Sequence, residues 1–346
     1  MIYRFDEIAI NSTAKKKPVE SDKFHYIGLE HIDSGTFEIS RWGSDVAPIG
    51  EKLIMKKGDV LFGKRRAYQR KVAIAPIDGI FSAHGMVLRP KEDVICKEFF
   101  PFFMSSNQFM DTAIRISVGG LSPTINWKDL QKQEFELPPI EEQRVLAEKL
   151  WAAYELKEAY RKMIAATDEM VKSQFIEMFK GDDQVPLGDI CNIEKGATIT
   201  RNDVLPGDIP VVAGGQEPSC YHNVANREAG AITVSASGAY AGFINLWSCP
   251  IFASDCNTVI SKDAEKTDQT FVYFGLKAMQ KQIYGLQKGG AQPHVYGKDL
   301  QKFMFPHPSY AKQIEFSKMA KQADKSKFEL QQAIDKIDKV MKSLLQ

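Results

Sequence analysis

Two long stretches of the chain, residues 140–180 and 309–346, carry hydrophobic side chains at helical spacing and contain neither glycine nor proline. Both are rich in Glu, Lys, Ala, Leu and Met, which have high helical propensity. Pro138 and Pro139 precede the first stretch and Gly181 follows it, as is typical of the two ends of a helix. The sequence therefore predicts one long helix in each stretch.

The hydrophobic positions of both predicted helices follow a heptad pattern, which is typical of helices that pair along a narrow seam. We expect the pairing positions to be Leu146, Leu150, Tyr160, Ile164 and Val171 in the first helix and Phe316, Leu330, Ile334, Ile337 and Met341 in the second. Each seam also contains one lysine, Lys157 or Lys327, which either fixes the register or is solvated at the seam edge. The alternative is that each seam packs only on its own domain.

Outside the predicted helices, short apolar or β-branched runs bounded by Gly, Pro, Asp or Ser predict a compact sheet in each half of the chain. The expected strands are Val60–Phe62, Val72–Ala75, Met86–Leu88, Ala231–Val234, Phe243–Leu246 and Thr258–Ile260. Helical spacing of Phe, Met, Ile and Leu predicts a further helix in each of two segments, Glu98–Ile116 and Asp268–Tyr284. Each half is therefore expected to be a mixed α/β domain.

The chain contains an internal repeat with a period of about half its length. Residues 119–132 return 170 positions later as residues 289–302, with eight of fourteen positions identical. A period this long indicates two copies of a domain, because solenoid repeats are only about 20 to 50 residues long. The expected fold is α+β, two mixed α/β domains in tandem repeat with two long helices. The expected boundaries are 1–139, 140–181, 182–308 and 309–346.

Composition narrows the class of protein. The chain has 346 residues, 44% of them hydrophobic, and a net charge of +1, which argues against a simple basic DNA-binding domain. It has five cysteines without a CxxC pair, which indicates neither a disulfide framework nor a zinc site. No apolar run approaches the ~20 residues of a membrane span, and the first ten residues do not resemble a signal peptide. We therefore expect a cytoplasmic protein without a membrane partner.

Familiar catalytic motifs are missing from the sequence. There is no GxxxxGKS or GxxxxGKT for nucleotide phosphates, no GxGxxG after a strand, no HExxH and no GxSxG. The Asn/Asp-Pro-Pro-Tyr/Phe motif of amino-methyltransferases is also missing. The sequence therefore predicts a binding protein without catalytic residues, metal ligands or a cofactor of its own.

The strongest local charge feature lies between two predicted strands and contains five basic residues in eight. Its members are Lys64, Arg65, Arg66, Ala67, Tyr68, Gln69, Arg70 and Lys71. Lys and Arg neutralise phosphates, Arg also binds guanine O6 and N7, Gln binds adenine, and Tyr stacks or packs. A hairpin would present these side chains as one DNA-binding patch, and the alternative is a solvated polar hairpin.

The second copy repeats the scaffold with different side chains. The stretch that corresponds to the basic hairpin is almost without charge and contains Ser235, Ser237 and Tyr240. The repeated Gly-Gly segments likewise share a backbone pattern around unlike residues, which suits readout of different bases. The further DNA-binding candidates in these segments are Thr124, Asn126 and Lys128 in the first copy and His294, Tyr296 and Lys298 in the second. The alternative is that Gly-Gly and Pro merely form a turn.

Four segments, in their order along the duplicated chain, resemble the DNA-specificity subunit of type I restriction-modification systems. They are Tyr26–Ile32, Gly58–Lys64, Leu137–Gln143, which opens the first long helix, and Pro186–Ile190, which opens the second copy. The resemblance covers essentially the whole chain. The segment Phe305–Ser309 departs from the usual Leu-Pro-Pro-Leu form, which leaves the alignment there open.

The resemblance implies two target recognition domains separated by two long antiparallel coiled-coil helices that act as a ruler. A helix of ~40 residues spans ~60 Å, or ~17 base pairs of double-stranded DNA at ~3.4 Å each. The implied target is an asymmetric, bipartite DNA sequence with an unread spacer. The implied partners are two modification (methyltransferase) subunits, which bind S-adenosylmethionine, and restriction (translocase-nuclease) subunits, which use ATP and Mg.

Three alternatives stay open at this point. One is the specificity subunit of a related system in which cleavage and methylation share one partner chain. A second is a coiled-coil scaffold that binds protein rather than DNA, which the near-neutral charge favours and the basic hairpin opposes. The third is a standalone nuclease or methyltransferase, which the missing motifs oppose.

Overall fold

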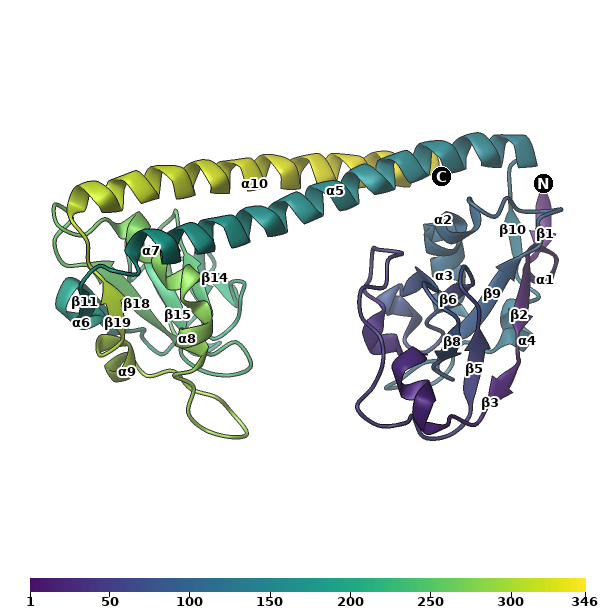
Figure 1. Ribbon diagram of the computed structural model, residues 1–346, viewed down its shortest axis with the longest axis horizontal. Helices are drawn as coiled ribbons and strands as arrows, with labels where there is room; N and C mark the ends of the chain where they lie inside the picture. Colours follow the sequence, from purple (N-terminus) through teal and green to yellow (C-terminus); the bar gives the residue numbers. More distant parts are fainter. The chain divides into compact units, whose positions relative to one another are not determined.

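The computed structural model describes residues 1–346, which form two compact units (Figure 1). Unit 1 comprises Met1–Ala159 and Ala333–Gln346, and unit 2 comprises Tyr160–Gln332. The long helices α5 (Ile140–Phe179) and α10 (Tyr310–Leu344) each contribute one part to each unit. The compact units therefore differ from the expected division at 140, 182 and 309, because each half-helix packs on a globular part. No helix combines the length and apolar character that a membrane span requires.

Unit 1 is built on two four-stranded sheets with the orders β2-β9-β6-β7 and β3-β5-β8-β4, and on the pair β1-β10. Its strands are β1 Ile2–Arg4, β2 Ala9–Ser12, β3 Lys15–Lys16, β4 Tyr26–Ile27, β5 Lys52–Met55, β6 Val60–Phe62, β7 Val72–Ile74, β8 Gly79–Phe81, β9 Met86–Pro90 and β10 Glu134–Glu136. Its short helices are α1 Phe5–Ile8, α2 Phe100–Ser105, α3 Asn107–Arg115 and α4 Trp127–Leu130, with 3₁₀ turns at Glu20–His25, Leu29–His31 and Ala67–Gln69.

Unit 2 repeats the first of these sheets with the order β12-β18-β15-β16 and adds the sheet β14-β13-β17 and the pair β11-β19. Its strands are β11 Gln184–Pro186, β12 Cys191–Lys195, β13 Ile209–Val212, β14 Cys220–His222, β15 Ile232–Ser235, β16 Ile244–Leu246, β17 Phe252–Ala253, β18 Cys256–Ser261 and β19 Met304–Pro306. Its short helices are α6 Leu187–Ile190, α7 Gln269–Ala278, α8 Gln280–Tyr284 and α9 Gly297–Gln301. The mixed α/β character and the duplication expected from the sequence are therefore present.

The predicted helix at 98–116 is two helices, and the prediction of one was wrong. Ser106 has extended backbone (φ −64°, ψ 158°) and ends α2, and its hydroxyl accepts a hydrogen bond from Phe109 N at 3.2 Å to cap α3. Serine favours this capping role over a helix interior because its side chain competes for backbone groups. The helix predicted at 268–284 is likewise interrupted, at Met279.

The seam residues of the long helices pack against the other long helix and also belong to the hydrophobic cores of the units. In unit 1, Leu150 of α5 shares a core with Met341 of α10, and Leu146 and Ile337 pack against it. In unit 2, Val171 and Phe316 lie in one core. The start of α5 thus packs with the end of α10 in unit 1, and its end with the start of α10 in unit 2, as in an antiparallel pair. The remaining seam positions are Tyr160, Ile164 and Leu330, which are half-buried, and Ile334, which is buried.

The seam lysines form two ion pairs that are copies of one another. Lys157 lies 2.9 Å from Asp338 within unit 1, and Lys327 lies 2.6 Å from Asp168 within unit 2. Both lysines and both aspartates are 170 positions apart, so one duplicated contact appears twice. Lys157 is buried with its side chain 7% exposed, whereas Lys327 is 22% exposed.

A buried glutamine near the start of each long helix forms hydrogen bonds with the backbone of the globular part. Gln143 Oε1 accepts from Cys96 N at 2.8 Å, and its Nε2 donates to Val94 O and Pro138 O. Gln313, 170 positions later, makes the corresponding three bonds with Asp268 N, Lys266 O and Pro308 O. Each amide side chain thus satisfies backbone groups that would otherwise be buried without a partner.

Candidate nucleic-acid interface

The basic segment of unit 1 forms the connection of an antiparallel strand pair, because β6 pairs with β7 in the register Phe62↔Val72. Arg66 and Arg70 flank the central 3₁₀ turn with left-handed backbone (φ 56° and 50°). Ala67 is buried within the turn and anchors it. Non-glycine residues in this conformation are uncommon and cluster at functional sites. The predicted hairpin is therefore a defined loop, which we call the hairpin loop (residues 63–71).

The Gly-Gly segment packs beside the hairpin loop. Arg66 N donates to Pro123 O at 2.7 Å, Ile125 N donates to Lys64 O at 3.0 Å, and Arg65 forms a β-bridge with Thr124. Gly119, at φ 112°, supplies the turn that a side chain would strain. Two candidate segments that lie far apart in sequence thus form one surface, the composite loop surface (residues 63–71 and 119–126).

Ser122 and His84 orient the arginines on this surface. Ser122 Oγ accepts hydrogen bonds of 2.9 Å from Nε of both Arg65 and Arg66, and His84 Nε2 lies 3.4 Å from Arg65 Nη1. Because a guanidinium only donates, the imidazole nitrogen must accept. Burial, followed by the charges of Arg65, Lys64 and Lys52, lowers the pKa of His84 from its ordinary value, which favours the neutral ring that can accept.

The positive charge extends beyond the segment that the sequence singled out. Burial and the nearby charge of Lys15 lower the pKa of Lys64. The charge of Lys52 contributes to the lowered pKa of His84. Sequence reasoning missed Lys15, Lys52 and His84 because they belong to other strands and to the loop before β9. β3 pairs with β5 in the register Lys15↔Leu53 and Lys16↔Lys52, which places Lys15 and Lys52 on neighbouring strands.

The other candidates of unit 1 differ in accessibility. Tyr68 is 53% exposed. Gln69, Asn126 and Lys128 are also exposed, and Thr124 is half-buried.

Two basic residues of the hairpin loop hold the loop instead of joining Arg65 and Arg66. Arg70 Nη2 donates to Asn107 Oδ1 at 2.7 Å and to Ser105 O. Lys71 Nζ donates to Leu29 O at 2.6 Å. Arg70 and Lys71 are thus tied to neighbouring elements, and a DNA contact by these two side chains stays a prediction.

Unit 2 contains a composite loop surface with the same backbone contacts, formed by residues 236–242 and 289–296. Ser237 forms a β-bridge with His294, Gly238 N donates to Pro293 O at 3.0 Å, and Val295 N donates to Ala236 O at 2.9 Å. The side chains, however, are hydroxyl-bearing and aromatic.

Tyr240 and Tyr296 are 46% and 45% exposed on the surface of unit 2. The rings of His294 and Tyr296 stack with centroids 5.9 Å apart, and the Lys298 ammonium lies 5.7 Å from the Tyr296 ring centroid. Ser235 was predicted to bind DNA, but the structure buries it. It is only 4% exposed because it lies within the β15–β18 ladder, and its hydroxyl donates to Gly215 O.

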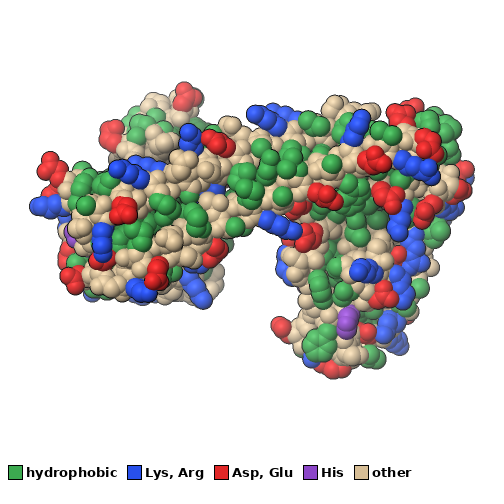
Figure 2. All heavy atoms as spheres, turned by 45° about the horizontal axis from the view of Figure 1, so that its top comes forward, with side chains coloured by type: hydrophobic (Ala, Val, Ile, Leu, Met, Phe, Trp, Pro, Cys, Tyr) green, Lys and Arg blue, Asp and Glu red, His purple; other side chains and the backbone are tan.

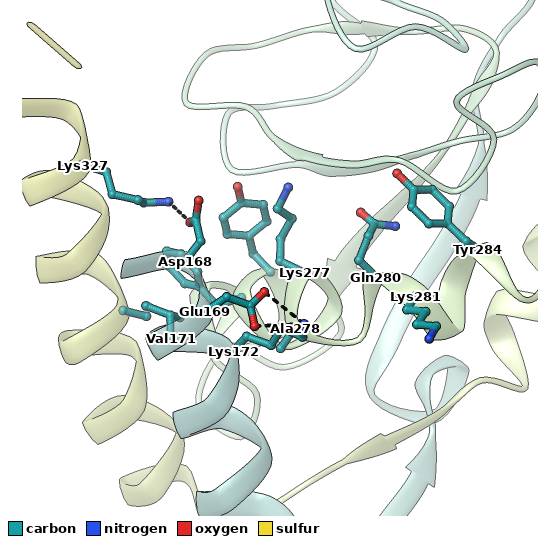
Figure 3. A pocket seen from close by; sticks show the side chains of 13 residues that line it. Asp168, Glu169, Val171, Lys172, Lys277, Ala278, Gln280, Lys281, Tyr284 and Lys327 are labelled. Atoms are coloured by element: carbon teal, nitrogen blue, oxygen red, sulfur yellow. Dashed lines mark hydrogen bonds and ion pairs between the residues drawn. The ribbon is translucent and has the colours of Figure 1, made fainter. Parts of the chain in front are cut away.

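A separate pocket of about 520 Å³ lies in unit 2 beside the Lys327–Asp168 pair (Figure 3). Its other carboxylate, Glu169, lies 3.2 Å from Lys172. Burial lowers the pKa of Lys277, whose ammonium lies 5.1 Å from the centroid of the Phe243 ring. The structure also contains no group of three or more His, Cys, Asp or Glu side chains placed to hold a metal ion.

The face drawn in Figure 2 shows Lys and Arg interspersed with Asp and Glu, and hydrophobic side chains along the long helices. On α5, Leu156, Met163 and Met170 follow one another at steps of seven and are 44%, 51% and 46% exposed. Leu156 belongs to unit 1 and Met163 and Met170 to unit 2, so each unit leaves apolar side chains of α5 exposed.

Comparison with solved structures shows the fold. The S subunit of a type I restriction-modification system from M. genitalium matches with a TM-score of 0.62 and 16% identity, over 100% of this chain and 94% of that one. A chain from a structural study of complex assembly and conformational transition of the type I R-M system matches with a TM-score of 0.54 and 18% identity. That match covers 100% and 96% of the two chains.

The specificity subunit of the type I restriction enzyme EcoDI from Escherichia coli is 25% identical over 185 residues. This match spans 52% of the chain and 41%, less than half, of that relative. Residues 7–163 and 181–339 each match the family described as Type I restriction modification DNA specificity domain, once for each copy of the duplication. The chain therefore belongs to the type I restriction-modification DNA specificity family.

Proposed function

We propose that the chain is the specificity subunit of a type I restriction-modification complex and reads an asymmetric, two-part DNA target, one part with each unit. The observation that carries this proposal is the pair of composite loop surfaces, which share one backbone arrangement and present different side chains. A constant scaffold with variable donors and acceptors is what direct readout of unlike base sequences requires. The function of the EcoDI relative supports the same assignment.

The two surfaces would read DNA by different interactions. In unit 1, Arg65 and Arg66 offer guanidinium groups that bind phosphates or guanine edges. In unit 2, the exposed phenol groups of Tyr240 and Tyr296 offer hydrogen bonds and ring faces with little charge. The two target parts would therefore be unequal, and binding of the first part would depend more strongly on salt.

The catalytic steps would belong to partner subunits. We propose that two methyltransferase subunits with S-adenosylmethionine modify adenine and that translocase-nuclease subunits with ATP and Mg cut DNA, in the cytoplasm. This chain would have no catalytic role, consistent with its missing phosphate-loop and methyltransferase motifs. The exposed apolar side chains of α5 support docking of a partner on the helices. Such partners would also supply phosphate contacts that a chain of net charge +1 lacks.

The proposal is tested by replacing Arg65 and Arg66 together with alanine and measuring binding of the complex to DNA in which each target part is scrambled in turn. We expect discrimination to be lost at one part and kept at the other. The matched control is the double variant Arg4→Ala, Arg144→Ala, which removes the same charge from β1 and α5. Equal loss at both parts would show general phosphate contact instead. A complex that forms but selects no DNA sequence would favour a protein scaffold.

A further inference from the structure

His84 and Asp255 occupy equivalent places behind the two composite loop surfaces. The carbonyl of His84 accepts from Arg65 N at 3.2 Å, and the carbonyl of Asp255 accepts from Ala236 N at 3.1 Å. Each residue lies just before the second strand in the order of its sheet, β9 in unit 1 and β18 in unit 2. The two donors differ by one position in the repeat, because Ala236 is the counterpart of Lys64 and Ser237 that of Arg65. The side chains of His84 and Asp255, however, contact those of the counterparts Arg65 and Ser237, so the contact recurs while imidazole is replaced by carboxylate.

In unit 1, this position supports a group that can only donate hydrogen bonds. Ser122 Oγ occupies Nε of Arg65, and His84 Nε2 lies beside Nη1, so the end of the guanidinium stays available. That end presents two parallel N–H groups, which match two acceptors side by side. In the DNA major groove, guanine offers such a pair, O6 and N7.

In unit 2, the same position supplies acceptors. The Ser237 hydroxyl donates to Asp255 Oδ2. The lone pairs of the hydroxyl and the second carboxylate oxygen of Asp255 therefore stay available as acceptors. No Lys or Arg forms an ion pair with Asp255. Arg227, whose charge acts on the neighbouring Cys256, binds Glu194. Gly214 approaches this pair closely, since a Cβ there would lie 2.6 Å from Ser237 O and 3.2 Å from Asp255 Oδ2.

A half-buried, unpaired carboxylate at a DNA-binding surface is unfavourable unless the DNA offers it a donor, because phosphates repel it. The donors that DNA presents in the major groove are the amino groups of cytosine N4 and adenine N6. Both bases thus present an amino group that can donate a hydrogen bond to a carboxylate. The change from a neutral imidazole that supports an arginine to a carboxylate therefore fits readout of opposite hydrogen-bonding patterns.

We infer that the Arg65–His84 and Ser237–Asp255 pairs are equivalent specificity determinants, the first reading guanine acceptors and the second reading a base amino group. This inference rests on the proposed function and adds to it which base edges each unit contacts. Arg65 and Asp255 touch the bases, whereas His84 is a positioning residue that acts through Arg65.

The test is selection of DNA from a randomised library by the complex of the full chain with its methyltransferase partner, scored base by base for each variant. Asp255→Ala is expected to lower discrimination about tenfold at one base pair of a single target part, since one base contact contributes about that much. Binding of unrelated DNA should stay equal or rise, because a repulsive charge is lost. A merely structural role would lower both.

Asp255→Asn keeps an acceptor for the Ser237 hydroxyl and so guards against misfolding. An amide both donates and accepts, which matches adenine N6 and N7, so this variant should favour adenine at the same position. His84→Ala should weaken a guanine preference in the other target part only. The matched control is Asp263→Asn, which removes one negative charge from unit 2 outside the composite loop surface, where Asp263 pairs with Lys266.

If the wild-type complex selects a two-part target and both Asp255 variants leave every base preference unchanged, the inference fails and the proposed function stands. The inference also fails if the variants weaken both target parts equally. If the wild-type complex selects no sequence at all, the proposed function and the inference both fail.

Discussion

Replacing Asp338 by asparagine removes the carboxylate that faces the buried ammonium of Lys157 in unit 1, across the helix pair. The two groups are 2.9 Å apart, and the side chains are 7% and 39% exposed for Lys157 and Asp338. The ammonium retains a 3.3 Å hydrogen bond to Gly35 O and lies 5.9 Å from the ring centroid of Tyr154. A buried charge would thus lose its strongest partner while its weaker contacts remain.

Loss of one partner of a fully buried pair costs about 3 to 5 kcal/mol, and of a surface pair about 0 to 1 kcal/mol. Because Asp338 is partly exposed, we expect Asp338→Asn to lower the free energy of unfolding of unit 1 by about 2 kcal/mol. The matched change Asp168→Asn should cost less than ~1 kcal/mol. Lys327 is more exposed, and Asp324 remains 3.1 Å away.

The assay is thermal unfolding of the full chain, with hydrogen exchange of the β6 and β15 amides to assign each transition to its unit. A loss of about 2 kcal/mol corresponds to a fall in Tm of about 4 to 8 °C for a unit of this size. The double variant Lys157→Met, Asp338→Asn should recover most of the loss, because a methionine leaves no unpaired charge. Equal shifts for Asp338→Asn and Asp168→Asn, or no recovery in the double variant, would refute the reasoning.

Three further predictions concern stability and thiol chemistry. Gln143→Leu should lower the free energy of unfolding by about 3 kcal/mol, since three buried backbone groups lose a partner, and urea denaturation measures this. Gly119→Ala, at φ 112°, should cost about 1 to 3 kcal/mol in the same assay, while Gly120→Ala, with open space around its Cα, should cost little. Burial raises the pKa of Cys256 to about 12, so at pH 8 a thiol reagent should leave Cys256 unmodified until the protein unfolds. The exposed Cys249 should react in the folded chain. Rapid labelling of Cys256 in the folded chain would contradict this prediction.

Much of the scaffold was predictable because it depends on local patterns and on the repeat. The heptads of the long helices, the β6–β7 connection and the Gly-Gly turns all have sequence signatures, and the duplication predicts that contacts recur. The repeat could also have identified the ion pairs, since Asp168 and Asp338 are 170 positions apart like Lys157 and Lys327.

Contacts that depend on sheet pairing could not be predicted from one sequence. His84 and Asp255 lie 19 and 18 positions from Arg65 and Ser237, and no local spacing links them. The same limit applies to Arg70, because one sequence does not show that its guanidinium donates to Asn107 of α3. Ser235 was misassigned because a short polar residue at a strand end looks like a loop residue until the β15–β18 register is known.

The central claim, that this chain directs a methyltransferase to a two-part DNA target, is tested most directly by mapping methyladenine in a methylation-free bacterial host. The host would express the chain together with its modification subunit, or either one alone. The account predicts a new split motif, two unequal blocks with a fixed unread gap, only when both are present. A stable complex that yields no motif, or the same motif without this chain, would contradict it.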